Sequence, residues 1–266
     1  MSAWEAPSLV ADCDSCFALC CVLLPFGAAS GFGIDKPGGT PCPNLAGDDR
    51  CRIHATLRRD GWTGCDVFDC FGAGQQVSQV TYAGVSWREH DDLGEMAAVL
   101  SVMRVLHEML AHLTEADRRS PDGSVGGLRD EIVRLTGATP VELLTADVDA
   151  LRERTSAVLS AASSRLRSGP TYDHADLAGH DLRQADLRDA DLRGATLIAA
   201  DLRDQELGRA DLLGADLRDA DLRGARLGET LFLAQTQVTG ARGDARTVLP
   251  ERLSRPGHWS SPERSR

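Results

Sequence analysis

The sequence predicts a multidomain protein of the α+β class, in which a C-terminal coil of five-residue repeats follows a helical middle and an irregular, cysteine-rich N-terminal module. Three observations lead to this prediction. The chain repeats in fives from Ala175 to Ala234, apolar residues recur every three or four positions from Leu93 to Leu113, and all eight cysteines fall within the first 70 residues. The expected segments are a cysteine-rich module at 1–90, a helical region at 91–168, the repeats with a C-terminal cap at 172–250, and a disordered tail at 251–266.

The repeat consists of twelve consecutive five-residue units without an insertion. The central position is leucine in eleven units and Phe232 in the last, and the position two before it is alanine in nine. A period of five fits neither an α-helix, at 3.6 residues per turn, nor a strand, at two. It fits a four-sided coil in which leucine fills the interior, alanine fits the tight inner corner and the other three positions face water.

These units resemble the pentapeptide-repeat family, whose consensus is A-(D/N)-L-x-x. The resemblance implies a right-handed quadrilateral β-helix, a solenoid with about twenty residues in each coil. The stretch 235–248 departs from the pattern, and we expect it to cap the C-terminal end because a solenoid must cover its exposed core.

The charge of the repeats bears on the partner that they could bind. Some members of the family mimic duplex DNA and bind type II topoisomerases. Here the twelve units hold 13 acidic residues and eight arginines, and the D-L-R pattern places each such arginine close to an aspartate. We therefore expect a surface of paired charges that serves as a protein-interaction scaffold, with DNA mimicry that protects a topoisomerase as an alternative. The net charge of −11 disfavours direct binding of nucleic acid.

The helical region shows clear start and stop patterns. The stripe from Leu93 to Leu113 predicts a helix of about six turns, which the run Ser120-Pro121-Asp122-Gly123 interrupts. A short helix is expected at 128–135. The run Thr139-Pro140-Val141-Glu142 predicts the capping box of another helix, which continues to Leu166. We expect an antiparallel helical pair, with a dimerising coiled coil as the alternative.

The eight cysteines carry most of the chemical information. They are Cys13, Cys16, Cys20, Cys21, Cys42, Cys51, Cys65 and Cys70. Two thiols separated by two or three intervening residues can turn toward one ion. Thiolates select zinc or an iron–sulfur cluster over hard cations. Adjacent Cys20 and Cys21 would serve two sites, or one ligand and one buried thiol, because neighbouring side chains diverge. His54 is a further ligand by spacing. Reduced buried or reactive thiols, and disulfides, are the alternatives.

The cysteine segment also resembles a cysteine-cluster family described as zinc- or iron-chelating. That family opens with C-x-x-C-x-x-C-C and continues with C-P-x-L and C-x-I-[HY] steps. Cys42-Pro43-Asn44-Leu45 and Cys51-Arg52-Ile53-His54 match these steps in order, whereas three residues instead of two precede the Cys20-Cys21 pair. The resemblance implies a metal site but leaves the grouping of its ligands open.

The remainder of the N-terminal module is irregular, apart from a short hairpin that we expect at Val77–Trp87. Metal ligation would take the place of the apolar core that this segment lacks. The apolar run Phe17–Phe26 is shorter than the ~20 residues that span a bilayer, and acidic residues precede it. We therefore expect a cytoplasmic protein without a membrane anchor, in which thiols stay reduced.

These observations predict a non-enzymatic protein that binds zinc or an iron–sulfur centre through its cysteines and docks a protein partner on its solenoid. An iron–sulfur or thiol redox enzyme component is the enzymatic alternative. Any homodimer would form through the helical region or an end of the solenoid.

Overall fold

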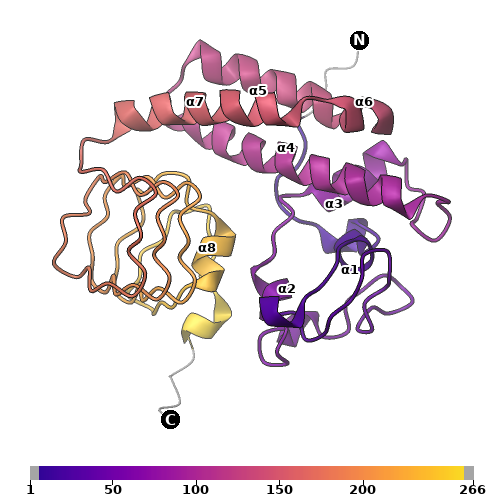
Figure 1. The fold of residues 1–266 in the computed structure, drawn as a ribbon, viewed down its shortest axis with the longest axis horizontal. Coiled ribbons are helices and arrows are strands. Elements are labelled where there is room, and N and C mark those ends of the chain that lie inside the picture. The colour runs from indigo at the N-terminus through magenta and orange to yellow at the C-terminus, as the bar shows by residue number, and fades with distance from the viewer. Residues whose placement is uncertain (1–5, 261–266) are drawn as a thin grey trace. The chain divides into compact units, whose positions relative to one another are not determined.

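The computed structural model describes residues 6–260 (Figure 1). The chain folds into two compact units, and the boundary between them follows Leu159. The first unit contains the cysteine-rich module and most of the helical region. The second contains the end of α7 and the repeats. The α-helices are α1 (Leu19–Leu23), α2 (Thr63–Val67), α3 (Ala73–Gln75), α4 (Leu93–Arg119), α5 (Gly123–Thr136), α6 (Pro140–Thr145), α7 (Val148–Leu166) and α8 (Gln235–Gly240). Four 3₁₀ turns, η1 (Cys13–Ser15), η2 (Ala28–Ser30), η3 (His54–Thr56) and η5 (Gly257–Ser260), and the π-helical segment η4 (Gln76–Thr81) complete the list.

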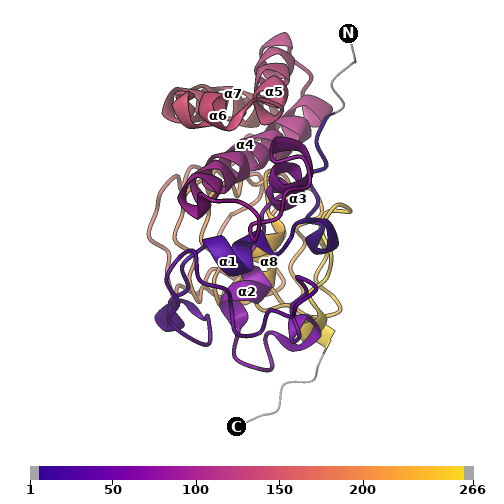
Figure 2. The same cartoon turned by 90° about the vertical axis from the view of Figure 1, so that its right-hand side faces the viewer.

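Helix α4 is the long helix that the apolar stripe predicts. Asp92 caps it, because its side chain accepts a hydrogen bond from the Glu95 amide at 2.9 Å. Its apolar face is buried, and it packs against α5 and α6 on one side and against α1 and α3 on another (Figure 2). By length and hydropathy alone α4 could cross a membrane, but 50% of its most apolar window is buried inside the protein. This is the burial expected of a core helix.

The predicted capping box is confirmed at the start of α6. Thr139 and Glu142 exchange side-chain and backbone hydrogen bonds, and Pro140 occupies the first helical position. The prediction of one continuous helix from Thr139 to Leu166 is wrong, because Ala146 adopts an extended conformation after α6. Asp147 then caps α7 by accepting a hydrogen bond from the Ala150 amide at 3.0 Å. Asp147, whose side chain caps a new helix, therefore interrupts the helix that the continuous apolar stripe predicts.

The predicted hairpin at Val77–Trp87 is also wrong. The chain there is helical, through α3 and η4, and then forms turns. Polar side chains of the helical turns explain this difference, because they bond to the N-terminal segment. Ser78 Oγ donates to the Cys16 carbonyl at 2.8 Å, and Gln79 Nε2 donates to the Ser15 carbonyl at 2.8 Å. Tertiary contacts therefore override the β propensity of Val77, Val80 and Tyr82.

In the repeats, the predicted inward positions are confirmed. Leu192, Leu197 and Leu202 are at most 1% exposed, and the alanines two positions before them are fully buried. Successive coils are joined by single parallel bridges between residues twenty apart, such as Asp191 with Asp211. The Leu192 amide donates to the Asp211 carbonyl at 2.9 Å, and this pattern recurs along the stack.

The predicted fold class is nevertheless wrong in its β component. The described residues contain no β-strand, their regular secondary structure is helical, and the expected right-handed quadrilateral β-helix is not seen. Eleven of the twelve five-residue units contribute one bridged residue each, the exception being the unit 185–189, and turn residues follow the bridge in most of them. Residues in the left-handed conformation, such as Asp204 (φ 57°) and Gly214 (φ 67°), end most of the short extended pieces. The ladder therefore never reaches the two consecutive pairs that a strand requires.

The C-terminal end of the repeats is covered by α8 and by the chain that follows it. Val238 is fully buried, and Gln237 Nε2 donates to the Leu212 and Ala215 carbonyls at 2.8 and 2.7 Å. Part of the segment expected as a disordered tail is also packed. Trp259 is 5% exposed and donates from Nε1 to the Ala241 carbonyl at 3.0 Å, whereas residues 261–266 lie outside the described range.

Candidate metal centre

One cavity of about 570 Å³ in the first unit gathers most of the cysteines. Seven of the eight line it, together with His54 and with an apolar wall that includes Phe26, Phe32 and Trp62. The seven are Cys13, Cys16, Cys20, Cys21, Cys42, Cys51 and Cys65. All eight cysteines are free thiols, so the structure brings them together without a disulfide.

The first four cysteines are placed by a short turn and a short helix. Cys13 opens η1, and Asp12 caps that turn by accepting a hydrogen bond from the Asp14 amide. Phe17 and Ala18 then adopt the left-handed conformation, with φ of 49° and 54°. This reversal separates Cys16 from α1, which contains Cys20 and Cys21. The Cys20 and Cys21 sulfurs lie 4.0 Å apart, within reach of a weak thiol hydrogen bond.

The cysteines farther along the chain are fixed by backbone contacts. The Cys42 amide donates to the Cys21 carbonyl at 3.0 Å, and the Leu45 amide donates to the Cys42 carbonyl at 3.0 Å. Leu45 in turn forms an antiparallel bridge with Cys51. Cys65 lies in α2, where its amide donates to the Trp62 carbonyl at 3.1 Å. The last three thiols in this set therefore share one framework with Cys21 and the aromatic wall.

Aromatic packing makes that wall rigid. The Phe26 and Phe32 rings stack with centroids 4.6 Å apart, and Trp62 meets Phe26 edge-on at 6.3 Å. A Cβ atom on Gly64 would lie 2.8 Å from the Phe32 ring, so only glycine allows α2 to approach the stack so closely. Water is thereby kept from one side of the thiol group.

Cys70 lies beside a smaller neighbouring cavity of about 60 Å³. Cys13, Cys16 and Cys20 line this cavity too. A Cβ atom on Gly74 would lie 3.5 Å from the Cys16 sulfur and 3.8 Å from the Cys70 sulfur. The two sulfurs therefore face the same point, and the glycine leaves the space there open.

The environment perturbs the thiols in opposite directions. A hydrogen bond from the Cys16 thiol lowers the pKa of Cys13 to about 6, and the nearby His54 adds to this effect. A hydrogen bond from Cys20 lowers the pKa of Cys21. Burial raises the pKa of Cys65 to about 12, reinforced by the neighbouring thiols of Cys21, Cys42 and Cys51. The pKa values of Cys13 and Cys21 are thus lowered, whereas burial raises the pKa values of Cys42, Cys51, Cys65 and Cys70.

Lys36, the only lysine of the chain, is buried beside this group. It is 5% exposed, and Nζ donates to four carbonyls, two of them, Leu24 and Thr40, at 2.7 Å. Burial lowers the pKa of Lys36, while the thiols of Cys42, Cys21 and Cys20 act in the opposite direction. The ammonium group therefore supplies a positive charge to the enclosed side of the thiol group.

The donor set suits a soft metal, but its side chains are not arranged as a finished site. Within residues 6–260 no group of three or more His, Cys, Asp or Glu side chains is positioned to hold a metal ion. The thiols line the cavity walls, but no three of them are gathered around one point. The chemistry of the predicted ligands therefore fits zinc or an iron–sulfur cluster, whereas their side-chain arrangement is not that of a closed metal site.

Lys36, the aromatic wall and the polar clamp, which is the set of hydrogen bonds that Gln75, Ser78 and Gln79 donate to the N-terminal segment, were not predicted from the sequence. The singular occurrence of lysine in an arginine-rich chain could have drawn attention to Lys36. Nothing in the sequence pattern could have revealed the clamp, because Gln75 and Val10 meet across 65 positions, with Nε2 of Gln75 donating to the Val10 carbonyl at 2.8 Å.

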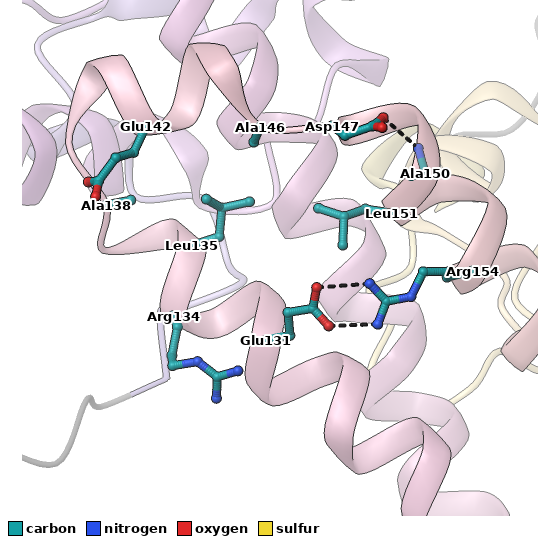
Figure 3. Close-up of a pocket in the computed structure, with 10 residues that line it drawn as sticks. All are labelled: Glu131, Arg134, Leu135, Ala138, Glu142, Ala146, Asp147, Ala150, Leu151 and Arg154. Carbon is teal, nitrogen blue, oxygen red and sulfur yellow. Dashed lines mark hydrogen bonds and ion pairs between the residues drawn. The ribbon is translucent and has the colours of Figure 1, made fainter.

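A separate groove of about 460 Å³ lies along α5, α6 and the start of α7 (Figure 3). Arg154 bonds both carboxylate oxygens of Glu131 across it, at 2.8 and 2.6 Å. The other side chains that line it include Leu135, Leu151 and small alanines. The residues that line the groove include no nucleophile or thiol, and two of its charged side chains, Glu131 and Arg154, already pair with each other.

Comparison with known proteins identifies the repeats. The family model described as pentapeptide repeats matches residues 173–204 and 197–232. The protein YybG of Bacillus subtilis (strain 168) is 44% identical over 264 residues, which cover 94% of this chain and 95% of that protein. The chain belongs to the pentapeptide-repeat family.

Solved structures of pentapeptide repeat proteins match only part of the chain. Rfr23 of the cyanobacterium Cyanothece 51142 is 37% identical, with 24% of this chain and 42% of that chain covered and a TM-score of 0.22. A protein of the Arabidopsis thaliana thylakoid lumen is 29% identical, covers 36% of this chain and 63% of that chain, and has a TM-score of 0.28.

Proposed function

We propose that this protein binds a soft metal, zinc or an iron–sulfur cluster, in its cysteine-lined cavity and uses its pentapeptide repeats as a scaffold for a protein partner. The observation that carries the metal assignment is the convergence of seven cysteines and His54 on one cavity. In our proposal the protein is not itself an enzyme, and it works in the cytoplasm, where thiols are kept reduced.

The energetics of the N-terminal module support a metal. Its buried apolar groups form a small cluster around Phe26, Leu57 and Trp62 and a second set in α1, α3 and η4, which includes Leu19, Val22 and Val77. The second set is buried where α1 and α3 pack on α4, so the small cluster alone must hold the loops that carry Cys42, Cys51 and Cys65, and it offsets only part of their conformational entropy. Coordination by thiolates can add about 10–16 kcal/mol in small zinc modules, so metal binding would complete the folding of this module.

The surface of the repeats supports a scaffold role more than DNA mimicry. Arg183, Arg203 and Arg218 each bond the aspartate two positions earlier, with closest contacts of 2.7, 2.6 and 2.5 Å. A mimic of duplex DNA needs unpaired negative charges along its length. Paired charges instead give a polar surface that a protein partner can bind through hydrogen bonds and shape complementarity.

The test is metal analysis of full-length protein purified without oxygen and without added metal. We expect zinc, in a colourless protein, or iron with sulfide, in a brown one, at one or more equivalents per chain. Metal-free protein that also fails to take up zinc or to accept reconstituted iron–sulfur clusters would overturn the metal assignment.

Limited proteolysis gives a second readout. Removal of the metal with a chelator should open the segment around Cys13 to Cys70 to cleavage, while the leucine-filled repeats remain protected. Replacement of both Cys13 and Cys16 by serine should have the same effect as the chelator. An N-terminal module that stays protected after chelation in reducing buffer would show that the cysteines are ordinary buried residues.

A further inference from the structure

The eight thiols fall into two groups of four that are defined by different surroundings. One group packs against the aromatic cluster, and the other lines the smaller cavity. Each of the eight belongs to one of these two environments and none to both, although Cys13, Cys16 and Cys20 also line the larger cavity beside the first group.

The first group consists of the thiols that pack on the cluster of Phe26, Leu57 and Trp62. Its members are Cys21, Cys42, Cys51 and Cys65. The hydrogen bond that the Cys42 amide donates to the Cys21 carbonyl and the β-bridge between Leu45 and Cys51 hold three of them on one backbone framework. Lys36 lies on this side, with Nζ 4.5 Å from the Phe26 ring centroid.

The second group consists of the thiols that line the smaller cavity. Its members are Cys13, Cys16, Cys20 and Cys70. Gly74 keeps the space between Cys16 and Cys70 open, and the Ser78 hydroxyl fixes the Cys16 carbonyl. Arg104 of α4 also lines this cavity, so a cation is present on this side as well.

The two groups meet at the adjacent pair Cys20 and Cys21, whose sulfurs are 4.0 Å apart. Cys20 lines the smaller cavity as well as the larger one, while Cys21 packs on the aromatic cluster. The pair therefore joins the two groups, both through the backbone and through this thiol contact.

We propose that the cysteines form two neighbouring four-thiolate metal centres, one of Cys21, Cys42, Cys51 and Cys65 and one of Cys13, Cys16, Cys20 and Cys70. This inference rests on the proposed metal-binding function and specifies its ligand sets. Four ligands complete the tetrahedral shell of a structural zinc ion, so eight thiols complete two such shells. Each divalent ion displaces four thiol protons and forms a centre of net charge −2, which Lys36 and Arg104 partly offset.

The two centres also account for the size of the site. A closed tetrahedral site needs no cavity, yet the thiols surround about 570 Å³ in the larger space. If the four thiols of each group moved toward their own ion, the cavity would close around two ions, one in each group, and not around a single ion. His54 hydrogen-bonds the Cys13 thiol and would then hold the second centre from outside its ligand set.

The experiment is a titration of reduced, metal-free, full-length protein with Co²⁺, whose thiolate charge-transfer and tetrahedral ligand-field bands count sites directly. We expect saturation at two equivalents per chain. Cys70→Ser and Cys65→Ser should each lose the four-thiolate spectrum of one equivalent and keep that of the other, and the double variant should lose both. Ser30→Ala, an exposed change in the same module, should retain two equivalents.

The outcomes separate this inference from the proposed function. Saturation at one equivalent, with both single variants losing the same site, would overturn the two-centre assignment and leave metal binding intact. Absence of any Co²⁺–thiolate band in the unmodified protein would overturn the two-centre assignment and the zinc form of the proposed function, whereas cluster reconstitution decides the iron–sulfur form. Retention of the other centre's four-thiolate spectrum in each single variant shows that the cysteine module still folds.

Discussion

The ammonium nitrogen of Lys36 lies 4.5 Å from the centroid of the Phe26 ring, in a pocket that leaves the lysine 5% exposed. The same nitrogen donates hydrogen bonds to the carbonyls of Val22 and Leu24, at the C-terminal end of α1, the helix that contains Cys20 and Cys21. One cation thus connects the aromatic wall, the backbone of the module and the thiol group. Removal of that cation should weaken all three.

Lys36→Met should lower the affinity of the protein for Zn²⁺ by about 10- to 100-fold, the usual effect of losing a group that supports metal ligands from behind. The metal-free module should also lose stability, because buried carbonyls would be left without donors. Competition with a zinc chelator measures the first effect, and hydrogen exchange of the module measures the second. Arg59→Met removes an exposed cation of the same module and should change neither quantity. Equal affinities in the two variants would contradict this role for Lys36.

In the metal-free protein, Cys13 should be the thiol that reacts first with iodoacetamide. It is exposed, and its pKa is lowered to about 6 by the hydrogen bond from the Cys16 thiol. The thiolate therefore forms as the pH rises through about 6, well below the usual value for cysteine. Peptide mass mapping of the label over a pH series should show half-maximal Cys13 alkylation near that pH.

Cys16→Ala provides the control for the Cys13 prediction. It removes the hydrogen bond that favours the thiolate, so the alkylation curve of Cys13 should move to higher pH. An unchanged curve would mean that the thiol of Cys16 does not lower the pKa. Bound metal should protect Cys13 from the reagent at every pH.

The repeats were predictable because a five-residue period leaves few ways to bury one leucine and one alanine per unit. The positions of Leu192 and its counterparts follow from that period alone. The secondary structure of the coil was not predictable in the same way. Whether a four-sided coil contains strands depends on how many consecutive residues pair, and left-handed residues such as Asp204 limit each side to a single bridge.

The cysteine site was predictable as a set of residues but not as an arrangement. Local spacing indicated metal ligands, and α-helical patterns indicated α4 and α6. The grouping of the thiols depends on contacts between distant segments, such as Gly74 with Cys16 and Ser78 with the Cys16 carbonyl. Such contacts leave no periodic pattern in the sequence, so the helical segment η4 was predicted as part of a hairpin.

The interior of the repeats should tolerate no charge. Leu192 is fully buried between neighbouring coils, so Leu192→Asp places an unpaired carboxylate in an apolar interior and should unfold the stack. Leu192→Ala should lower the free energy of unfolding by about 2–5 kcal/mol. Arg188→Glu, at an exposed position, should change it by less than about 1 kcal/mol. Hydrogen exchange of repeat amides measures each effect, and equal effects for the leucine and arginine changes would contradict the assignment of inward positions.

The stability of the repeats should also depend on pH through Asp211. This carboxylate is fully buried, and burial raises its pKa. A raised pKa in the folded state means that Asp211 favours folding most when it is protonated, below the pKa of the unfolded chain. That contribution is lost as the pH rises through the folded value. At neutral pH the folded state therefore holds a buried charge at Asp211, which lies beside Ser163 of α7 and outside the leucine-filled interior, and burial disfavours that charge.

Asp211→Asn should consequently stabilise the repeats at pH 7, by about 1 kcal/mol, and the gain should shrink as the pH approaches 4. The amide oxygen can still accept the bond that the Leu213 amide donates to Asp211 Oδ1 at 2.9 Å, so the turn survives the change. Arg193 lies 3.6 Å from Asp211 Oδ2 and keeps its closer partner Asp191 at 3.1 Å.

Asp176→Asn is the matched control, because Asp176 occupies the same position of an exposed unit and makes the same turn with the Ala178 amide. Thermal unfolding of both variants and the unmodified protein over a pH series provides the measurement. A stabilisation by Asp211→Asn that is equal at every pH, or that Asp176→Asn reproduces, would show that the buried charge of Asp211 is not its cause.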